Sequence, residues 1–521
     1  RRDHQAYDTP MRDDEPHLLT RTLAADAHDE KTAFASADLK ADIKAVKPGS
    51  STASETDGSS DDEHAKLMFS DEDTGSNPRE EPPTKTLRDM CEPRFWSLVT
   101  LAALAASAPL VLVCTFFTVA LHRLFEKPTT AAPNGKVAIV SGGKMTKSFV
   151  MIKQLKKLGC RVVLVETSKY WMVASRFSKC VDRFVTVPVP EKETDAYLAA
   201  MAALAEEEGA DLFVPVTSPV ASQYEAQLER VLPEKCHSWS LSHQETVLLD
   251  DKVVFCQAAE ALGLPAPASH RVCSHAEAHA FNDRLRDEAA REPTTKHAKY
   301  IFKNLQYDSM HRLDLFTLPC APAELAAYLD TIEIDEANPW TAQTFIVGDE
   351  YSSCAIVKDG NLLSFVANAA SISCFNYSPE RNPRLRQWVQ TFCEARRLSG
   401  VICIDFIVEA DGTPYAIECN PRFSSNITCF YNSSALGEVC VDPHAPFTGT
   451  KEPLASCVET YWLFSEVWAA LTKPGLLRDA PARARALLHT VRHKKDAYFD
   501  AHDPLPFLAH FFVHIPTLLL R

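Results

Sequence analysis

Hydrophobic and polar positions change their spacing several times along the chain. Residues 1–90 show no sustained apolar period and are rich in Ser, Asp, Glu, Thr and Ala. A segment of this composition, such as STASETDGSSDDE at 51–63, buries too little apolar surface to offset the entropy of an ordered chain. We therefore expect residues 1–90 to form a disordered acidic tail.

Residues 95–121 carry no charge over 27 consecutive positions. About 20 apolar residues cross a hydrocarbon core, so this pattern predicts a transmembrane or membrane-inserted segment. Pro109 fits either a kinked span or a re-entrant hairpin, and basic residues at both ends leave the orientation open. The apolar run at 507–520 is shorter, which favours a core or interfacial element.

From residue 134 short apolar strands alternate with amphipathic helices, with strands expected at 136–140, 161–166 and 211–217 and a helix at 148–159. This alternation is typical of a parallel sheet whose ligand crevice lies at the carboxyl ends of the strands. The loop SGGKMTK follows the first strand. It is not a P-loop, because Met145 follows Lys144 where that motif has Ser or Thr. Its glycines either hold an anionic ligand or form an ordinary tight turn.

The pattern after residue 246 is different. A helix is expected at 250–267, strands at 300–304 and within 341–353, and a hairpin at 401–422. Asp411-Gly412 is a strong signal for a two-residue hairpin turn. A turn centred there places Asp405 directly opposite Glu418.

That pairing brings polar chemistry to one face of the predicted hairpin. Because side chains alternate along a strand, Asp405, Glu418 and Asn420 project from the same face. Two opposed carboxylates repel, and either a shared proton or a divalent cation relieves the repulsion. The amide oxygen of Asn420 favours a hard cation such as Mg2+. Arg422 follows closely enough to meet a phosphate or a developing anion.

Composition narrows the function classes. The chain has 521 residues, which suggests two to four domains, and a net charge of −15 that argues against a nucleic-acid partner. Residues 1–90 hold 12 Lys and Arg against 21 Asp and Glu, so most of the negative charge lies in the tail. The 16 cysteines form no C-x-x-C pair, which favours a reducing compartment over a zinc site or disulfide framework.

An Asp, a hairpin and then Glu-x-Asn-Pro-Arg resemble the metal-binding end of the ATP-grasp ligases. The resemblance implies an α/β ATP-grasp fold, in which a Rossmann-like domain precedes two α+β lobes that clasp ATP. The corresponding domains would be 134–245 and 246–435, followed by a C-terminal region, 436–521. It further implies ATP and Mg2+ as cofactors, with Asp405, Glu418 and Asn420 on the metal.

The resemblance also implies the nucleotide contacts. Lys252 and Lys303 match the two basic residues that hold ATP phosphates, and Glu350 matches the acid that takes the ribose hydroxyls. The adenine would be flanked by residues of one strand and hinge, Gln343, Thr344, Phe345 and Ile346. Thr344 departs from the superfamily, which has an acid there, and the loop after Lys303 lacks the usual glycines.

A more specific likeness covers roughly residues 95–521. SGGKMTK, ETSKYWMVASRFS, VPVTSPVAS, YDSMHRLDLFTLPC and IECNPR together resemble the mycosporine-glycine synthase family. This implies a ligase that uses ATP to join glycine to the cyclohexenone 4-deoxygadusol through a phosphorylated intermediate, giving mycosporine-glycine. It assigns catalytic roles to Arg422, Lys303 and Arg312. It places Tyr307, Asp308 and Arg312 on a loop closing over ATP, and the cyclohexenone near Ser141–Lys144 and Thr217–Ser218.

Two other interpretations stay open at this point. One is an ATP-grasp ligase for another acid and amine. The other is a non-catalytic, membrane-anchored ATP-binding module. The intact set of Asp405, Glu418 and Asn420 speaks against the second. We expect a membrane anchor through residues 95–121, with the catalytic domain in the cytosol or the plastid stroma. The identity of the amine, the organelle and the membrane topology are left open.

Overall fold

The computed structural model describes residues 87–125, 132–216, 221–291, 298–306, 314–370, 376–472 and 476–520. The Cα positions separate two compact units. The first comprises residues 1–96 and 309–313, and the second comprises residues 97–308 and 314–521. Residues 1–86 of the predicted acidic tail, the loop residues Tyr307, Asp308 and Arg312, and the pair Thr217–Ser218 lie outside the described residues, whereas the last four residues of the tail, 87–90, are helical.

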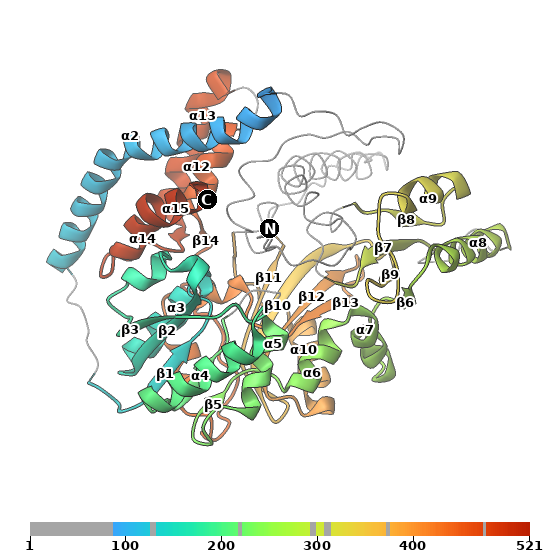
Figure 1. Cartoon of the computed structure of the whole chain (residues 1–521), viewed down its shortest axis with the longest axis horizontal. Coiled ribbons are helices and arrows are strands. Elements are labelled where there is room, and N and C mark those ends of the chain that lie inside the picture. Colours follow the sequence, from blue (N-terminus) through green and yellow to red (C-terminus); the bar gives the residue numbers. More distant parts are fainter. Residues whose placement is uncertain are drawn as a thin grey trace, which may run out of the picture. The chain divides into compact units, whose positions relative to one another are not determined.

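The second unit begins, after one helix, with a five-stranded parallel sheet of order β3-β2-β1-β4-β5 (Figure 1). Its strands are β1 (Val137–Val140), β2 (Arg161–Thr167), β3 (Arg183–Val187), β4 (Leu212–Val214) and β5 (His237–Ser238). Helix α3 (Thr146–Lys157) shares an apolar cluster with Val140 and Leu164, while α4 (Thr194–Glu208) packs with Ile139 and Val163. Because successive strand residues face opposite sides, the two helices cover opposite faces. The predicted parallel sheet is confirmed.

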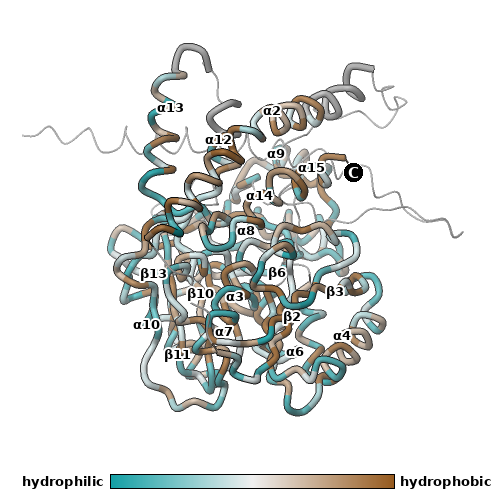
Figure 2. Tube along the Cα trace, turned by 90° about the vertical axis from the view of Figure 1, so that its left-hand side faces the viewer, coloured by the Kyte–Doolittle hydropathy of each residue, from teal (hydrophilic) through white to brown (hydrophobic). Residues whose placement is uncertain are grey.

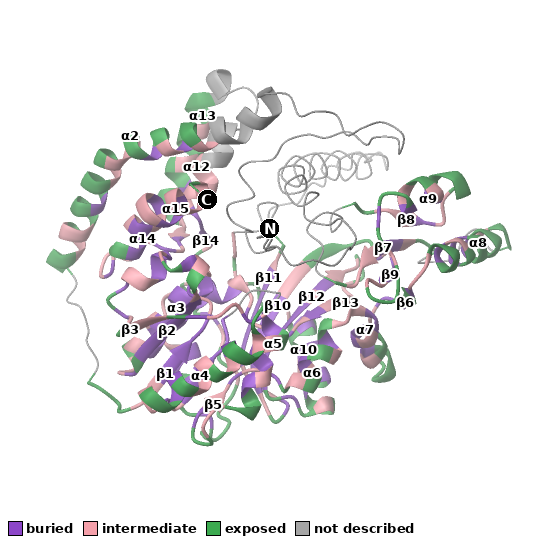
Figure 3. Ribbon diagram, viewed as in Figure 1, coloured by how far each residue is buried: buried purple, intermediate pink, exposed green. Residues whose placement is uncertain are grey.

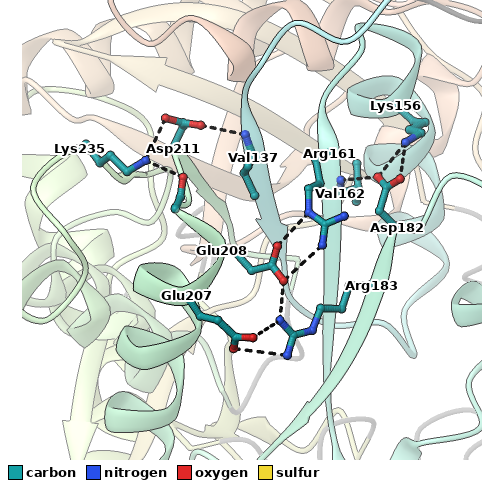
Figure 4. Close-up of polar contacts among 11 residues, drawn as sticks. Val137, Lys156, Arg161, Val162, Asp182, Arg183, Glu207, Glu208, Asp211 and Lys235 are labelled. Carbon is teal, nitrogen blue, oxygen red and sulfur yellow. Dashed lines mark hydrogen bonds and ion pairs between the residues drawn. The ribbon is translucent and has the colours of Figure 1, made fainter.

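Charged side chains form hydrogen bonds and ion pairs that link the strands at the amino-terminal edge of this sheet (Figure 4). The carboxylate of Asp211 accepts the N–H of Val137, the first residue of β1, at 2.8 Å. Glu208 binds Arg161 at 2.9 Å and Arg183 at 2.6 Å, and so links the first residues of β2 and β3. These contacts occupy the edge opposite the carboxyl ends, where ligands bind in open parallel sheets.

A second sheet is antiparallel, with strand order β6-β9-β7-β8. Its strands are β6 (Ser269–Val272), β7 (Tyr300–Asn304), β8 (Thr317–Leu318) and β9 (Trp340–Thr344). Helices α8 (His275–Arg291) and α9 (Pro322–Leu329) pack against it through an apolar cluster that contains Phe302, Leu318 and Trp340. The sheet and its two helices form the small lobe.

A third sheet, of order β11-β10-β12-β13, forms the large lobe. Its strands are β10 (Asp349–Lys358), β11 (Asn361–Ala369), β12 (Gly400–Val408) and β13 (Pro414–Asn420). Helices α7 (Lys252–Ala261) and α10 (Pro383–Arg396) cover one face through residues such as Phe255, Trp388 and Phe406. The 3-10 segment η5 (Ser425–Phe430) packs on β10 and β11, in a cluster with Cys354 and Val366.

Four residues, 345–348, connect the small-lobe sheet to the large-lobe sheet. The expected strand region 341–353 is therefore divided between β9 and β10. Gly348 is fixed by a close approach, because a Cβ there would lie 2.2 Å from the carbonyl oxygen of Val408. Any larger residue would push the connection away from the end of β12.

Strands β12 and β13 form the predicted hairpin, but not through the predicted turn. β12 ends at Val408 and β13 begins at Pro414, so residues 409–413 connect them. The expectation of a two-residue turn centred on Asp411-Gly412 was wrong. The local hydrogen bonds instead run from Gly412 N–H to the Glu409 carbonyl and from Glu409 N–H to the Thr413 carbonyl, which closes a wider loop.

A bulge nevertheless restores the expected pairing farther along the hairpin. Phe406 pairs with Ala416, and Asp405 pairs with Glu418, so Ile417 is the extra residue of β13. A bulge of this kind places two residues opposite one and reverses the faces beyond it. The predicted opposition of Asp405 and Glu418 is therefore confirmed, for a reason that the turn signal did not contain.

The C-terminal region returns to the first domain. The region contains a short parallel pair, β14 (Thr460–Tyr461) and β15 (Lys495–Asp496), with two of its helices between the strands and the others after them. Its helices are α12 (Leu463–Thr472), α13 (Leu476–His493), α14 (Leu505–Ala509), the π-helical turn η6 (His510–His514) and α15 (Ile515–Leu519). Phe507, Phe511 and Ile515 are buried in the cluster that includes α3, so this run supplies core residues, one of the two predicted alternatives.

Helix α2 (Leu87–Phe125) is continuous through Pro109. Within the described residues, Ser97–Phe125 is long and apolar enough, by length and composition, to cross a membrane. Thr100, Leu104 and Thr115 are buried, whereas most residues of 97–125 are exposed (Figure 3). Much of the same helix is hydrophobic (Figure 2). Its exposed side chains include Leu98, Leu110, Val113, Phe116, Phe117, Leu121, Leu124 and Phe125.

Candidate active site

The hairpin face carries two carboxylates bridged by an amide. Asp405 on β12 pairs directly with Glu418 on β13. The Nδ2 group of Asn420 donates to Asp405 Oδ2 at 3.1 Å and to Glu418 Oε1 at 3.4 Å. The three residues therefore lie together on one face, as their spacing predicts.

The two carboxylates hold their protons very differently. Burial and the neighbouring Glu418 raise the pKa of Asp405 well above its usual range. Burial alone would raise the pKa of Glu418 too, but Lys252 and Lys303 outweigh it and hold that pKa at about 2. Burial therefore favours the protonated form of Asp405, whereas the two lysines favour the ionised form of Glu418.

Two lysines from different elements converge on Glu418. Lys252 is the first residue of α7, whose N-terminus is capped by Asp251, and its Nζ lies 3.4 Å from Glu418 Oε2. Lys303 lies on β7 of the small lobe, and burial lowers its pKa while Glu418 opposes that change. The two residues expected on ATP phosphates thus lie in one electrostatic cluster with the acid pair.

Arg422 extends the cluster beyond the end of β13. Its Nη2 donates to Asn420 Oδ1 at 2.7 Å, whereas its Nε is buried and has no hydrogen-bond partner among the described residues. Asp250, at the end of α6 (His243–Asp250), is a buried acid that Arg422 and Lys252 stabilise against the pKa-raising effect of burial. A buried N–H without an acceptor suits an anionic group of a ligand.

The donor set fits a divalent cation only in part. Nowhere in the described ranges do three or more His, Cys, Asp or Glu side chains gather closely enough to hold a metal. Asp405 and Glu418 supply two carboxylates, which suit Mg2+. Asn420 presents its nitrogen to them, so its oxygen reaches the same position only after the amide turns over.

Gln343, on the strand expected at the adenine, makes its hydrogen bonds within the protein. Gln343 is 1% exposed on the central strand β9, and its Nε2 donates to Ile417 O at 3.0 Å and Ser269 Oγ at 3.2 Å. Its backbone pairs with β6 and β7 on either side. Side chain and backbone of Gln343 are both engaged within the protein, and its place beside the base stays a prediction.

The remaining hinge residues are also engaged in contacts within the protein. The N–H groups of Thr344 and Phe345 donate to the carbonyls of Ala268 and Lys299, at 2.9 and 2.8 Å. Ile346 is buried, at 3% exposure, at the junction of the two lobes. Thr344, Phe345 and Ile346 therefore stay predictions for the adenine site.

Strand β10 contributes two residues to the site: Glu350, which the sequence predicted, and Ser352, which it did not. Glu350 lies on β10, and its charge is close enough to influence Asp405 and Lys303. Ser352, two residues along, pairs with Asp405 across the ladder and hydrogen-bonds to its carboxyl group. No sequence pattern marked Ser352, because its role depends on the register of β10 against β12.

The loop after β1 lies at the carboxyl edge of the parallel sheet, as predicted. Ser141 Oγ donates to Glu225 at 3.0 Å and accepts the N–H of Val216 at 3.1 Å. Lys144 Nζ lies 4.3 Å from the centre of the Tyr170 ring. Helix α3 begins just after this loop, and its Lys147 donates to the carbonyl of Phe423, next to Arg422.

Sequence comparison identifies the domain that carries this cluster. The ATP-grasp domain family profile matches residues 325–426. The chain contains an ATP-grasp domain. The match covers the hinge, Glu350, Asp405, Glu418 and Asn420, and the fold predicted from the hairpin is confirmed. The prediction of an ATP-dependent ligase is confirmed.

Two solved structures are similar to this chain at low sequence identity. L-amino acid ligase from Bacillus licheniformis is 16% identical, and the match covers 58% of this chain and 70% of that chain with a TM-score of 0.40. N5-carboxyaminoimidazole synthetase from Staphylococcus aureus, complexed with ADP, is 14% identical over 67% and 88% of the two chains, with a TM-score of 0.46. A search of curated proteins finds no match.

Proposed function

We propose that this ATP-grasp domain activates an acid with ATP and joins it to an amine, forming a C–N bond through a phosphorylated intermediate. One observation carries the proposal. The opposed pair Asp405 and Glu418 lies between Lys252 on one side and Arg422, through Asn420, on the other. Phosphoryl transfer needs positive groups around the phosphates and fixed positions for the reacting atoms, and this cluster offers both.

Each residue has a role that its position supports. Lys252 and Lys303 would bind ATP phosphates, and the buried Nε of Arg422 would donate to the transferring phosphoryl group or the adduct. Asp405 and Glu418, with Asn420 after its amide turns over, would hold Mg2+. When bound, that ion neutralises phosphate charge and lets Asp405 lose its proton. Arg312, outside the described residues, keeps its proposed catalytic role.

The specific substrates we propose are 4-deoxygadusol and glycine, with mycosporine-glycine as the product. The motif likeness over residues 95–521 supports this pair. 4-Deoxygadusol is a vinylogous acid, so its enol oxygen is a nucleophile comparable with a carboxylate. Helix α3, just after the Ser141–Lys144 loop, contacts the chain beside Arg422 through Lys147, which supports a cyclohexenone site between the loop and the acid pair.

One assay tests the proposal. The full chain, purified in detergent, is given ATP, Mg2+, 4-deoxygadusol and each of several amino acids, and ADP release and product absorbance are followed. We expect glycine-dependent ADP release with an ultraviolet-absorbing product. ADP release with an ordinary carboxylic acid and an amine, but not with 4-deoxygadusol, would favour the alternative ligase. ATP binding without turnover on any pair would favour the non-catalytic module.

We also propose that α2 holds the enzyme at a membrane. Its buried positions include Thr100 and Thr115, while its exposed positions include Phe116 and Phe117. A helix on the surface of a water-soluble protein has the opposite arrangement, with polar residues outside. Large apolar side chains facing outward are suited to lipid. The catalytic domain would then lie in the cytosol or the plastid stroma, where ATP is available.

A further inference from the structure

Four polar side chains form a row across the large-lobe sheet. Asn368 on β11 pairs with Ser352 on β10, Ser352 pairs with Asp405 on β12, and Asp405 pairs with Glu418 on β13. Directly paired residues project from the same face of a sheet. Asn368 therefore belongs to the face that carries the acid pair, although it lies 37 residues before Asp405 in the sequence.

The neighbouring row on the same face is apolar on β11, β10 and β12, and its member on β13 is Asn420. Val366 pairs with Cys354, and Cys354 with Cys403, and all three are buried in one hydrophobic cluster together with residues of η5. The row of Asn368 thus marks the line on the sheet where apolar packing stops and polar groups begin. Binding sites of enzymes commonly combine an apolar wall with a few polar groups in this way.

Asn368 has an unusual hydrogen-bond state. Its side chain is buried, at 1% exposure, and its Nδ2 donates to the carbonyl of Ala369 at 3.0 Å. Its Oδ1 accepts no hydrogen bond from any described residue. The hydroxyl of Ser352 is bonded to Asp405, so its single proton is not available to Asn368. Buried acceptors are normally satisfied, which points to a donor supplied by a ligand.

The position of Asn368 suits one substrate better than the others. Adjacent strands lie about 4.8 Å apart, so Asn368 lies roughly 10 Å from Asp405 across β10. That distance is long enough to separate a transferring phosphoryl group beside Asp405 from a second reactant beside Asn368. Phosphates and an ionised acid bring only acceptors, and the ribose hydroxyls of ATP are expected at Glu350, whereas an amine brings N–H donors.

We infer that the amine substrate binds over β10 and β11 with one N–H donated to Oδ1 of Asn368. This inference rests on the proposed function and assigns a place to its second reactant. An amine held there approaches the activated acid from the side of the sheet away from Lys252, which lies beside Glu418 on β13. A hydroxyl group on the acid substrate is the competing donor, and the experiment separates the two sources.

The test compares three variants of the full chain, using the acid and amine that give turnover in the assay above. Asn368→Ala removes the acceptor, Asn368→Asp keeps an acceptor oxygen, and Asn361→Ala is the control on the same strand outside the row. Initial rates give KM for each substrate. Positional isotope exchange in ATP, with the acid but without the amine, reports the phosphorylation step, and thermal unfolding checks the fold.

We expect Asn368→Ala to raise the KM of the amine at least tenfold. The KM of the acid, ATP affinity and isotope exchange should stay within about twofold of wild type. Asn368→Asp should recover part of the loss, which a purely structural role would not predict. An unchanged amine KM, or a raised KM for the acid instead, overturns the inference while the ligase function stands. Wild type without amine-dependent turnover overturns both.

Discussion

At the scale of single residues, the opposed acids Asp405 and Glu418 decide the chemistry. Their pKa values move in opposite directions because lysines reach Glu418 while burial dominates at Asp405. We predict that Asp405→Asn or Glu418→Gln lowers turnover by roughly 10²–10³-fold or more with the fold retained. Steady-state ADP release measures this, with Asp349→Asn, an exposed acid on β10, as control. Near-normal activity of either variant at ordinary Mg2+ concentrations would remove the pair from the site.

The raised pKa of Asp405 also predicts how stability depends on pH. Between the unfolded and folded pKa values the folded chain binds more protons, so the free energy of unfolding falls as pH rises. The slope contributed by Asp405 is at most about 1.4 kcal/mol per pH unit. Urea unfolding between pH 5 and 8 in chelator should show a steeper fall for wild type than for Asp405→Asn. Parallel curves for the two proteins would contradict the assignment.

Lys303 gives a separate prediction. Lys303→Ala should weaken ATP binding about 10- to 100-fold, because a charge-assisted contact with phosphate is worth about 1.5–3 kcal/mol. Titration calorimetry with an ATP analogue measures this, and Lys299→Ala, an exposed lysine nearby, should bind normally. An unchanged affinity of the Lys303 variant would place that lysine outside the nucleotide site.

At the scale of elements, the bulge in β13 and the strand β9 hold the site together. Gln343 reaches from the small lobe to the carbonyl of Ile417, the extra residue whose presence turns Glu418 toward Asp405. Gln343→Leu leaves buried groups unpaired, and we predict a loss of about 1–3 kcal/mol in unfolding free energy. Urea unfolding measures this, with the exposed Gln306→Leu as control. Equal stability of the two variants would show that the hydrogen bonds of Gln343 do not stabilise the fold.

At the scale of the whole molecule, α2 connects the body to its proposed membrane. Leu104 of α2 belongs to the same apolar cluster as Phe507 and Ile515, and His122 lies against His502 with ring centres 4.8 Å apart. We predict that deleting residues 1–125 releases an active enzyme into the soluble fraction. It should be less stable than the full chain, because part of that cluster loses its cover.

Fractionation after alkaline carbonate washing measures the release. Phe116→Asp in the full chain should weaken membrane retention, since it places a charge on the outward face, whereas His122→Gln should not. If the truncated chain still pellets after the wash, the C-terminal helices are an integral anchor as well, and the simple form of the proposal fails.

The sequence by itself determined the elements and the chemical character of the site. Apolar alternation predicted the parallel sheet, an uncharged run predicted the long apolar helix, and the two-residue spacing of Glu418 and Asn420 assigned them to one face of a strand. These features depend on local periodicity, which a sequence records directly.

Only the tertiary structure decided how these elements combine. The turn at 409–413 and the bulge at Ile417 both differ from the local signal, and together they produce the predicted pairing. Gln343 also supports the bulge from another lobe, a contact that no local pattern predicted. Ser352 and Asn368 join the acid pair through strand register, which hydrogen bonds between distant segments fix and no local spacing records.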